Sequence, residues 1–189
     1  MGTIRVAGLD TSLCRTGVAV LACTPENRWT VHTFDVPTAS RVGDTERDKL
    51  ERMDYIVSTV ASVMADMDAV ALEGLAFGAP GRATRDLAGL WWLAYRRLAR
   101  LEVPVVIIAP TQAKAYATGS GRADKRDMSR AALRMWPEHE TSSGDQDDAL
   151  ILASIVAELS GLPVPFDQPD YRRDALGRVP RPEDLPEFS

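Results

Sequence analysis

A short apolar run near the start of the chain ends abruptly in a carboxylate, and it constrains the fold more than any other stretch. The run spans residues 3–10 and ends at Asp10, and small polar residues separate it from a second apolar run at 17–23. Two such runs joined by Thr, Ser and Gly residues predict a β-hairpin. Asp10 then lies at the carboxyl end of the first strand, where open α/β sheets usually place their ligands. Because Asp also favours turns, this stretch alone leaves open whether Asp10 is functional or only begins the turn.

The remaining apolar patterns predict three further strands and five helices. We expect strands at 29–36, 68–73 and 103–108, and helices at 44–67, 82–101, 110–117, 123–136 and 145–159. Helical spacing in the first helix predicts one buried face, formed by Leu50, Met53, Ile56, Val57, Val60 and Met64. The order of elements predicts an α/β fold with one mixed five-stranded sheet flanked by helices. We expect the first, fourth and fifth strands to be parallel and the hairpin strands to lie at one edge.

The length of 189 residues suits a single folded domain. We expect this domain to span residues 1–160. After Gly161 the chain contains six prolines and few aliphatic residues, which predicts an extended, proline-rich tail at 161–189.

Composition excludes several classes of protein. Two cysteines and two histidines are too few for a disulfide framework or a histidine-rich zinc site. The chain has neither a charged and then apolar leader nor an apolar run near about 18 residues, so we expect no membrane association. We therefore expect a soluble protein of a reducing compartment: the cytoplasm, or the host cytoplasm if the chain is encoded by a phage.

The charge of the chain is unevenly distributed. A net charge of −5 argues by itself against nucleic-acid binding. The segment from Arg82 to Arg134, however, contains eleven Lys or Arg residues and only four Asp or Glu residues. A basic middle between acidic flanks can present a positive face to a nucleic acid. The alternative is that the helices of this segment simply have solvated basic faces.

Four acidic residues lie at the ends of predicted elements. Asp10 ends the first strand, Glu73 ends the fourth, and Asp145 and Asp148 are one turn apart at the start of the last helix. If the first and fourth strands are neighbours, these carboxylates meet. An all-oxygen ligand set suits Mg²⁺ or Mn²⁺ rather than zinc, and two such ions about 4 Å apart are the usual device for phosphodiester hydrolysis. Each acid also has a simpler explanation, as an exposed strand end or a favourable charge at a helix N-terminus. Asp147 is either a spare ligand or only such a helix-start residue.

Four short motifs follow one another along residues 4–159. They are Gly8-Leu9-Asp10 with Thr16-Gly17, then Ala71-Leu72-Glu73, then the sequence at 110–114 with 119–121 and 123–125, and finally the acidic run at 145–150. No single motif is specific, but in this order and spacing they resemble the RuvC family of Holliday junction resolvases, within the RNase H-like superfamily. The resemblance implies an RNase H-like nuclease domain with two Mg²⁺ or Mn²⁺ ions per active site. It implies metal ligation by Asp10, Glu73, Asp145 and Asp148, and phosphate contacts near the cleavage site by Lys114 and Lys125.

The same resemblance implies that the substrate is branched DNA, especially four-way junctions, and that a homodimer makes paired symmetric nicks. The side chains that we expect to contact DNA are basic or aromatic: Arg15, Phe77, Arg82, Arg85, Lys114, Arg122, Lys125 and Arg126. The family dimerises through the helix at 82–101, whose apolar stripe predicts a subunit contact by Leu87, Leu90, Trp91 and Ala94. The alternative is that its tryptophans only pack on the sheet.

The chain departs from the family pattern at two places. Thr11-Ser12 follows the first Asp, where the family usually has a Pro-Gly or similar pair. The family's aromatic residue three positions after the Glu falls here on Ala76. Phe77 therefore either takes over the aromatic role or packs in the core.

Three other functions are compatible with parts of the pattern. An RNase H-like nuclease for flaps, branched DNA or RNA–DNA hybrids would use the same acids without junction selectivity. Asp10-Thr11-Ser12 with Gly17 also resembles the phosphate loop of actin-like ATPases, although that superfamily needs two such domains and a longer chain. A DNA-binding module without catalysis would not need the complete acidic set.

Overall fold

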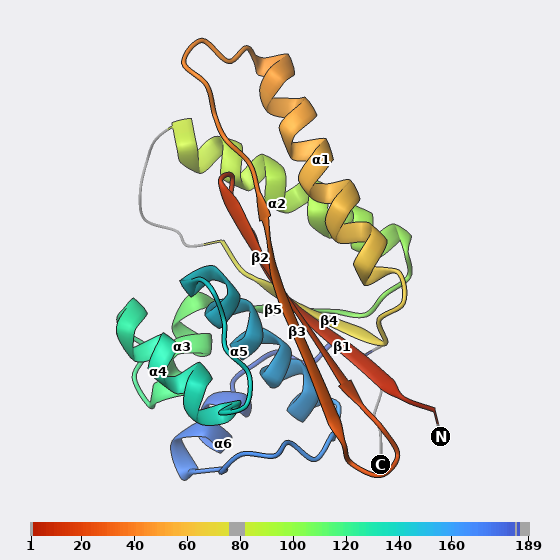
Figure 1. Cartoon of the computed structure of the whole chain (residues 1–189), viewed down its shortest axis with the longest axis vertical. Helices are drawn as coiled ribbons and strands as arrows, with labels where there is room; N and C mark the ends of the chain where they lie inside the picture. Colours follow the sequence, from red (N-terminus) through yellow and green to blue (C-terminus); the bar gives the residue numbers. More distant parts are fainter. Residues whose placement is uncertain (1, 76–81, 184, 186–189) are drawn as a thin grey trace.

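A single mixed sheet forms the centre of the molecule (Figure 1). The computed structural model describes residues 2–75, 82–183 and 185. The strands are β1 (Ile4–Asp10), β2 (Arg15–Cys23), β3 (Trp29–Pro37), β4 (Ala69–Glu73) and β5 (Val105–Ile108), in the spatial order β3-β2-β1-β4-β5. The first three strands pair antiparallel, and β4 pairs parallel with both β1 and β5. The predicted mixed sheet, with the hairpin strands at one edge, is confirmed.

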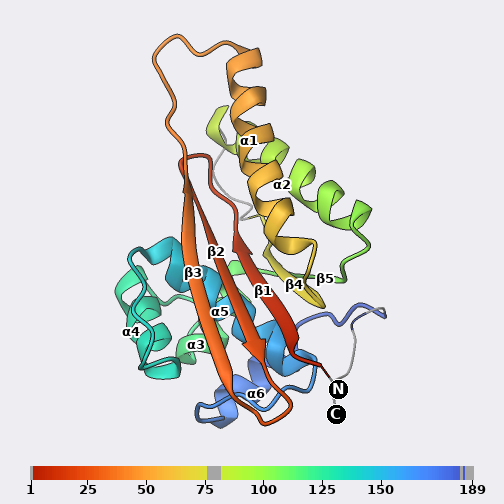
Figure 2. The same ribbon diagram turned by 45° about the vertical axis from the view of Figure 1, so that its right-hand side comes forward.

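Helices cover both faces of this sheet (Figures 1 and 2). On one face lie α1 (Glu46–Met64) and α2 (Arg82–Arg100). On the other, α5 (Gly144–Leu159) packs on β1 and β2, with α3 (Pro110–Thr118), α4 (Lys125–Met135) and α6 (Asp170–Leu176) around it. Buried apolar side chains form two clusters, one on each face of the sheet. Within residues 2–75, 82–183 and 185, no helix has the length and apolar character needed to cross a membrane.

Strand alternation decides which side chains face α5, because successive residues of a strand point to opposite faces of a sheet. In β1, Val6 belongs to the cluster around α5, whereas Leu9 belongs to the cluster around α1 and α2. Asp10 is an even number of residues from Val6 and therefore lies on the α5 face. In β4, Ala71 belongs to the α5 cluster, so Glu73 lies on that same face.

Two glycines let α5 lie directly on the sheet. A Cβ atom at Gly8 would come within 2.0 Å of the backbone oxygen of Ala149, and one at Gly17 within 2.0 Å of that of Asp145. Neither distance is possible between real atoms, so any side chain at these positions would displace the helix. Such close backbone approach is a recognised use of glycine within a strand. The first turn of α5 is therefore held against the end of β1 and the start of β2.

The buried face of α1 is shorter than predicted. Met53, Ile56, Val60 and Met64 are buried, but Leu50 is half exposed. The expected burial of Leu50 is wrong because the first turns of α1 extend beyond the sheet (Figure 2).

The C-terminal segment is not the extended tail that its composition predicted. Residues 170–176 form α6, and Leu162, Val179 and Leu185 are buried in the cluster around α5. The prolines prevent long regular structure but do not prevent burial, because well-spaced apolar residues between them reach the core. Within this segment, α6 packs against α3.

Candidate active site

The carboxyl ends of β1 and β4 bring Asp10 and Glu73 together. Leu9 pairs with Leu72 in parallel register, so the next residue of each strand lies at the same level of the sheet. Both acidic side chains lie on the α5 face, and Glu73 is hydrogen-bonded to Asp10. The indole N–H of Trp91 donates to the backbone oxygen of Glu73 at 2.7 Å, which anchors the end of β4.

The first turn of α5 adds two carboxylates to this end of the sheet. Ser143 caps the helix, its side chain accepting the backbone N–H of Gln146 at 3.2 Å. Asp145 and Asp148 are partly buried, and both interact electrostatically with Asp10. The acids of β1, β4 and α5, which are far apart in the sequence, thus gather in one place.

Burial and crowding raise the pKa of three of these acids. Burial, reinforced by the charge of Asp145, raises the pKa of Asp10 to about 6. Burial and the neighbouring charge of Asp10 raise the pKa of Glu73 to about 9. Burial and Asp10 likewise raise the pKa of Asp148 to about 7. At neutral pH the cluster therefore holds protons that a bound cation would displace.

Two lysines approach the cluster from different helices. Lys125, the first residue of α4, places its Nζ atom 3.8 Å from Oδ1 of Asp145, and its side chain is 83% exposed. Lys114 projects from α3, and its positive charge lowers the pKa of Glu73. The burial of Glu73 raises the same pKa by more, so the net shift is upward. Positive charge thus borders the carboxylates on the side formed by α3 and α4.

The chemistry of the cluster fits Mg²⁺ or Mn²⁺. All four acids offer oxygen, the ligand atom that these hard cations prefer. As they stand, no three His, Cys, Asp or Glu side chains in the described part of the chain are placed to hold one ion. The raised pKa of Glu73 means that binding an ion near neutral pH would release a proton from this carboxyl group.

Asp147 does not take part in the cluster in the way its neighbours do. Its carboxylate is 5% exposed and accepts hydrogen bonds from the hydroxyl groups of Thr141, at 2.5 Å, and of Ser129. These bonds tie the start of α5 to α4 and to the loop between them. The sequence left the role of Asp147 open because this structural role depends on partners from other elements.

Three of the arginines expected to contact DNA are free to do so. Arg15 is exposed where β2 begins, immediately after the turn that follows Asp10. Arg122 and Arg126 are exposed on either side of the start of α4, next to Lys125. The start of α4 therefore presents an exposed basic surface beside the carboxylates.

The remaining candidates for DNA contact differ. Arg85 is paired with Asp86 at 3.2 Å and with Glu46 at 3.5 Å, so part of its charge is balanced within the protein. Phe77 and the side chain of Arg82 lie outside the described residues.

Three of the four residues expected in the subunit contact on α2 are buried within their own chain. Leu90, Trp91 and Ala94 are buried in the cluster formed with α1 and the sheet, and Leu87 is partly buried. The apolar stripe of α2 packs on the sheet of its own chain. Leu90 and Ala94 are therefore not available to a second subunit, whereas Trp91 also lines a groove at the surface.

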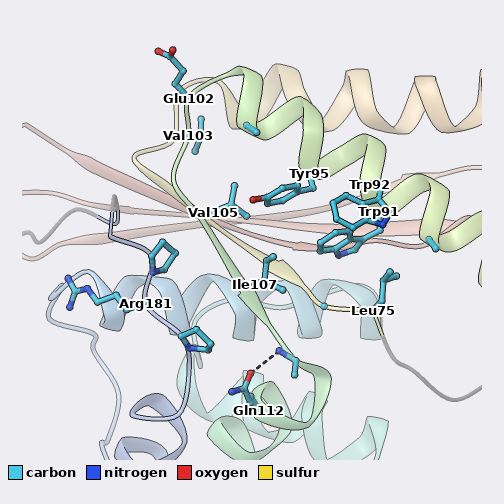
Figure 3. A pocket seen from close by; sticks show the side chains of 16 residues that line it. Leu75, Trp91, Trp92, Tyr95, Glu102, Val103, Val105, Ile107, Gln112 and Arg181 are labelled. Atoms are coloured by element: carbon cyan, nitrogen blue, oxygen red, sulfur yellow. Dashed lines mark hydrogen bonds between the residues drawn. The ribbon is translucent and has the colours of Figure 1, made fainter.

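A different surface of α2 borders a groove that the sequence analysis missed (Figure 3). The groove has a volume of about 1320 Å³ and lies between α2, the edge strand β5 and the C-terminal segment. Trp92 is 60% exposed there, Tyr95 lies beside it, and Ile107 is exposed on β5. Trp91 and Trp92 are neighbours in sequence, but one residue turns a helix by about 100°. One indole is therefore buried and the other is not.

Comparisons with known proteins place this site in context. The crossover junction endodeoxyribonuclease RuvC of Parafrankia sp. is 31% identical over 154 residues, which cover 79% of this chain and 84% of that protein. The Thermus thermophilus RuvC structure matches with a TM-score of 0.66 at 21% identity, over 84% of this chain and 98% of that one. T. thermophilus RuvC in complex with Holliday junction substrate also gives 0.66, at 23% identity, over 79% and 90%. These two structures support the fold. No protein-family model matches the chain.

Proposed function

This chain belongs to the RuvC family of crossover junction endodeoxyribonucleases, and we propose that it resolves four-way DNA junctions by cutting two strands symmetrically. One observation carries the proposal: the carboxylates of Asp10, Glu73 and Asp148 meet at the ends of β1 and β4 and the start of α5, with Lys114 and Lys125 beside them. Clustered oxygen ligands bordered by ammonium groups suit hydrolysis of a phosphodiester.

The acids are the proposed ligands of Mg²⁺ or Mn²⁺, two ions per site. The set comprises Asp10, Glu73, Asp145 and Asp148. When bound, such ions activate the attacking water and stabilise the leaving oxygen. Glu73 holds a proton at neutral pH because burial and Asp10 raise its pKa to about 9, so it must release this proton to become a ligand. The close approach of the carboxylates, which keeps this proton bound, also favours binding of a divalent cation. The cation would neutralise negative charges that otherwise repel one another.

Lys114 and Lys125 are the proposed contacts to the phosphate that is cut. Each can offset the negative charge that accumulates on the phosphate in the transition state. Arg122 and Arg126 extend positive charge outward from Lys125 along an exposed surface. Contacts of this kind position a DNA backbone and make its binding depend on salt concentration.

Two symmetric cuts require two active sites, which we expect a two-fold homodimer to supply. An open four-way junction has a matching two-fold axis. We place the subunit contact at the groove between α2 and β5, where Trp92 and Ile107 expose apolar surface. Aromatic residues are enriched in subunit interfaces, and the open edge of β5 offers further pairing.

Cleavage of synthetic nucleic acids tests the proposal. Four-way, three-way and linear DNAs and an RNA–DNA hybrid would each be incubated with Mg²⁺, Mn²⁺, Ca²⁺ or EDTA. We expect the four-way junction to be cut with Mg²⁺ or Mn²⁺, and to be bound but not cut with Ca²⁺, which has looser coordination geometry. Equal cutting of the other substrates would instead indicate an RNase H-like nuclease without junction selectivity. Full activity in excess EDTA would contradict the metal site.

A further inference from the structure

In the C-terminal segment, α6 and the residues that follow it up to Arg178 pack against α3, the helix that carries Lys114. At the start of α3, the side-chain amide of Gln112 donates to the backbone oxygen of Arg178 at 2.8 Å. One turn further along, Nε of Arg172 donates to the backbone oxygen of Tyr116 at 3.3 Å. Both bonds join α3 to residues that the extended-tail prediction left without a role.

A third contact lies where α3 ends. Gly119 terminates the helix in the left-handed conformation, with φ of 83°, and its N–H donates to the backbone oxygen of Ala115 at 2.9 Å. The ring of Tyr171, from α6, covers this glycine so closely that a Cβ atom there would lie 3.2 Å from the ring. The three contacted positions are about one helical turn apart: Gln112, Tyr116 and Gly119. They therefore share one face of α3.

Arg172 makes the central contact rigid. It is 5% exposed, and its guanidinium lies 5.1 Å from the ring centre of Tyr116 and 4.8 Å from that of Phe166. The Tyr116 hydroxyl in turn donates to Glu158 of α5 at 2.5 Å, and the Gln168 amide donates to the same carboxylate at 2.6 Å. A buried arginine held this way connects α3, α5 and α6 in one network.

Lys114 lies on the opposite side of α3 from these contacts. It is two residues from Gln112 and two from Tyr116, and at 3.6 residues per turn that is roughly half a turn in either direction. From there its charge acts on Glu73. The helix has only nine residues, and helices this short are held mainly by tertiary contacts. The position of Lys114 therefore depends on what packs behind it.

We propose that the C-terminal segment is a brace that positions Lys114 at the active site, with Arg172 and Tyr171 as its positioning residues. The importance of Lys114 for cleavage rests on the proposed function, whereas the brace itself does not. The segment thus contributes to catalysis through α3 without contacting the substrate.

Two variants remove the brace and a third controls for changes on the same helix. Tyr171→Ala uncovers the end of α3, and Arg172→Met removes the hydrogen-bond donors while keeping a long apolar side chain. Asp174→Ala changes an exposed residue of α6. With enzyme in excess over junction, we expect the first two to lower the single-turnover cleavage rate about tenfold, since a misplacement of about 1 Å can cost 100-fold. Junction affinity should stay within about twofold, and the control should match the wild type.

Combination with Lys114→Ala separates positioning from a general structural loss. If the brace acts through Lys114, Arg172→Met should lower the rate no further once that side chain is absent. A tenfold loss that persists in full in the Lys114→Ala background would overturn the proposal. So would wild-type rates in both brace variants.

Hydrogen–deuterium exchange decides the brace independently of activity. Residues 110–124 should exchange several-fold faster in Tyr171→Ala and Arg172→Met than in the wild type and in Asp174→Ala. Unchanged exchange would overturn the brace, whatever the chain cleaves. Faster exchange in a protein that cuts no junction would support the brace and contradict only the proposed function.

Discussion

The two faces of the sheet are packed in different ways. Beneath α5, Gly8 and Gly17 leave the helix backbone in direct contact with the strands. Beneath α1 and α2, larger side chains such as Met53, Leu90 and Trp91 fill the space between helix and sheet. Flexible side chains can adjust to a small displacement, whereas touching backbones cannot. The four acids all lie on the face covered by α5. The proposed active site is therefore on the face where backbone contacts leave the least room for displacement.

Replacing one glycine by alanine on each side of the sheet gives the sharpest test of this difference in packing. Gly8→Ala places a Cβ atom 2.0 Å from a backbone oxygen of α5, and we expect a loss of about 4 kcal/mol or more in the free energy of unfolding. Gly89→Ala, within α2, places its Cβ atom 3.8 Å from the sulfur of Met53, an ordinary contact. There we expect a gain of up to about 1 kcal/mol from helix propensity. Urea unfolding measures both, and equal stabilities would contradict the close contact of α5.

Neighbouring aspartates on α5 separate the chemistry of this face from its architecture. Asp148→Asn should lower the rate of junction cleavage by at least about 100-fold and leave junction binding nearly intact. Changes to residues that only support a metal ligand already cost about 10–100-fold, so loss of a ligand should cost at least as much. Asp10→Asn should behave in the same way. Asp147→Asn should cut within about threefold of the wild-type rate but lose about 1–3 kcal/mol of stability, because its carboxylate accepts two hydroxyl groups. Cleavage assays and unfolding on the same preparations check this, and an inactive, stable Asp147→Asn would reverse the assignment.

Neighbouring tryptophans on α2 provide the matching test on the opposite face. Trp91→Ala removes a buried indole and should cost about 3–5 kcal/mol. Trp92→Glu alters a side chain that is 60% exposed, so the fold should persist while the proposed dimer dissociates. Light scattering measures the mass, and a cruciform plasmid distinguishes linear product, cut on both strands, from nicked circles. A Trp92→Glu protein that stays dimeric and linearises the plasmid would place the subunit contact elsewhere.

These residues show why the sequence predicts some features and not others. Strand and helix periodicity predicted the mixed sheet with the hairpin strands at one edge, because each strand depends on a pattern within one element. The meeting of Asp10 with Glu73 was predicted only on the condition that the first and fourth strands are neighbours, which the pairing of β1 with β4 fulfils. An apolar stripe on α2 is the same whether it packs on its own sheet or on a partner. The sequence therefore could not tell whether Trp91 is covered by its own sheet or by a second subunit.

Other features depend on partners that are distant in the sequence. The hydrogen bonds of Asp147 come from Ser129 and Thr141, and the burial of Arg172 depends on Tyr116 and Phe166. The prolines of the C-terminal segment predicted an extended tail. That prediction failed because local propensity cannot show that a segment packs against a distant surface such as α3. The tail is thus where local signals and tertiary packing disagree most.

The smallest expected effect concerns the proton on the α5 face. Burial and the charge of Asp10 raise the pKa of Glu73 from 4.5 to about 9 in the folded protein. Between these values the folded state binds more protons than the unfolded state, so the contribution of Glu73 to the free energy of unfolding falls as the pH rises. It is most favourable at low pH and least favourable above about pH 9. Without divalent cations, the wild type should therefore lose stability across this window.

Glu73→Gln isolates that contribution, because the amide keeps an N–H donor for Asp10 but cannot lose a proton near neutral pH. In EDTA at pH 8 we expect this variant to melt a few degrees above the wild type, since about 1 kcal/mol shifts Tm by about 2–4 °C in a chain of this size. Near pH 5 the two should melt together. Mg²⁺ should narrow the gap by stabilising the wild type through binding. Melting curves of both proteins would be recorded from pH 5 to 9. The same pH dependence in the two proteins would contradict a protonated Glu73. A difference in Tm that Mg²⁺ widened would argue against Glu73 as a ligand.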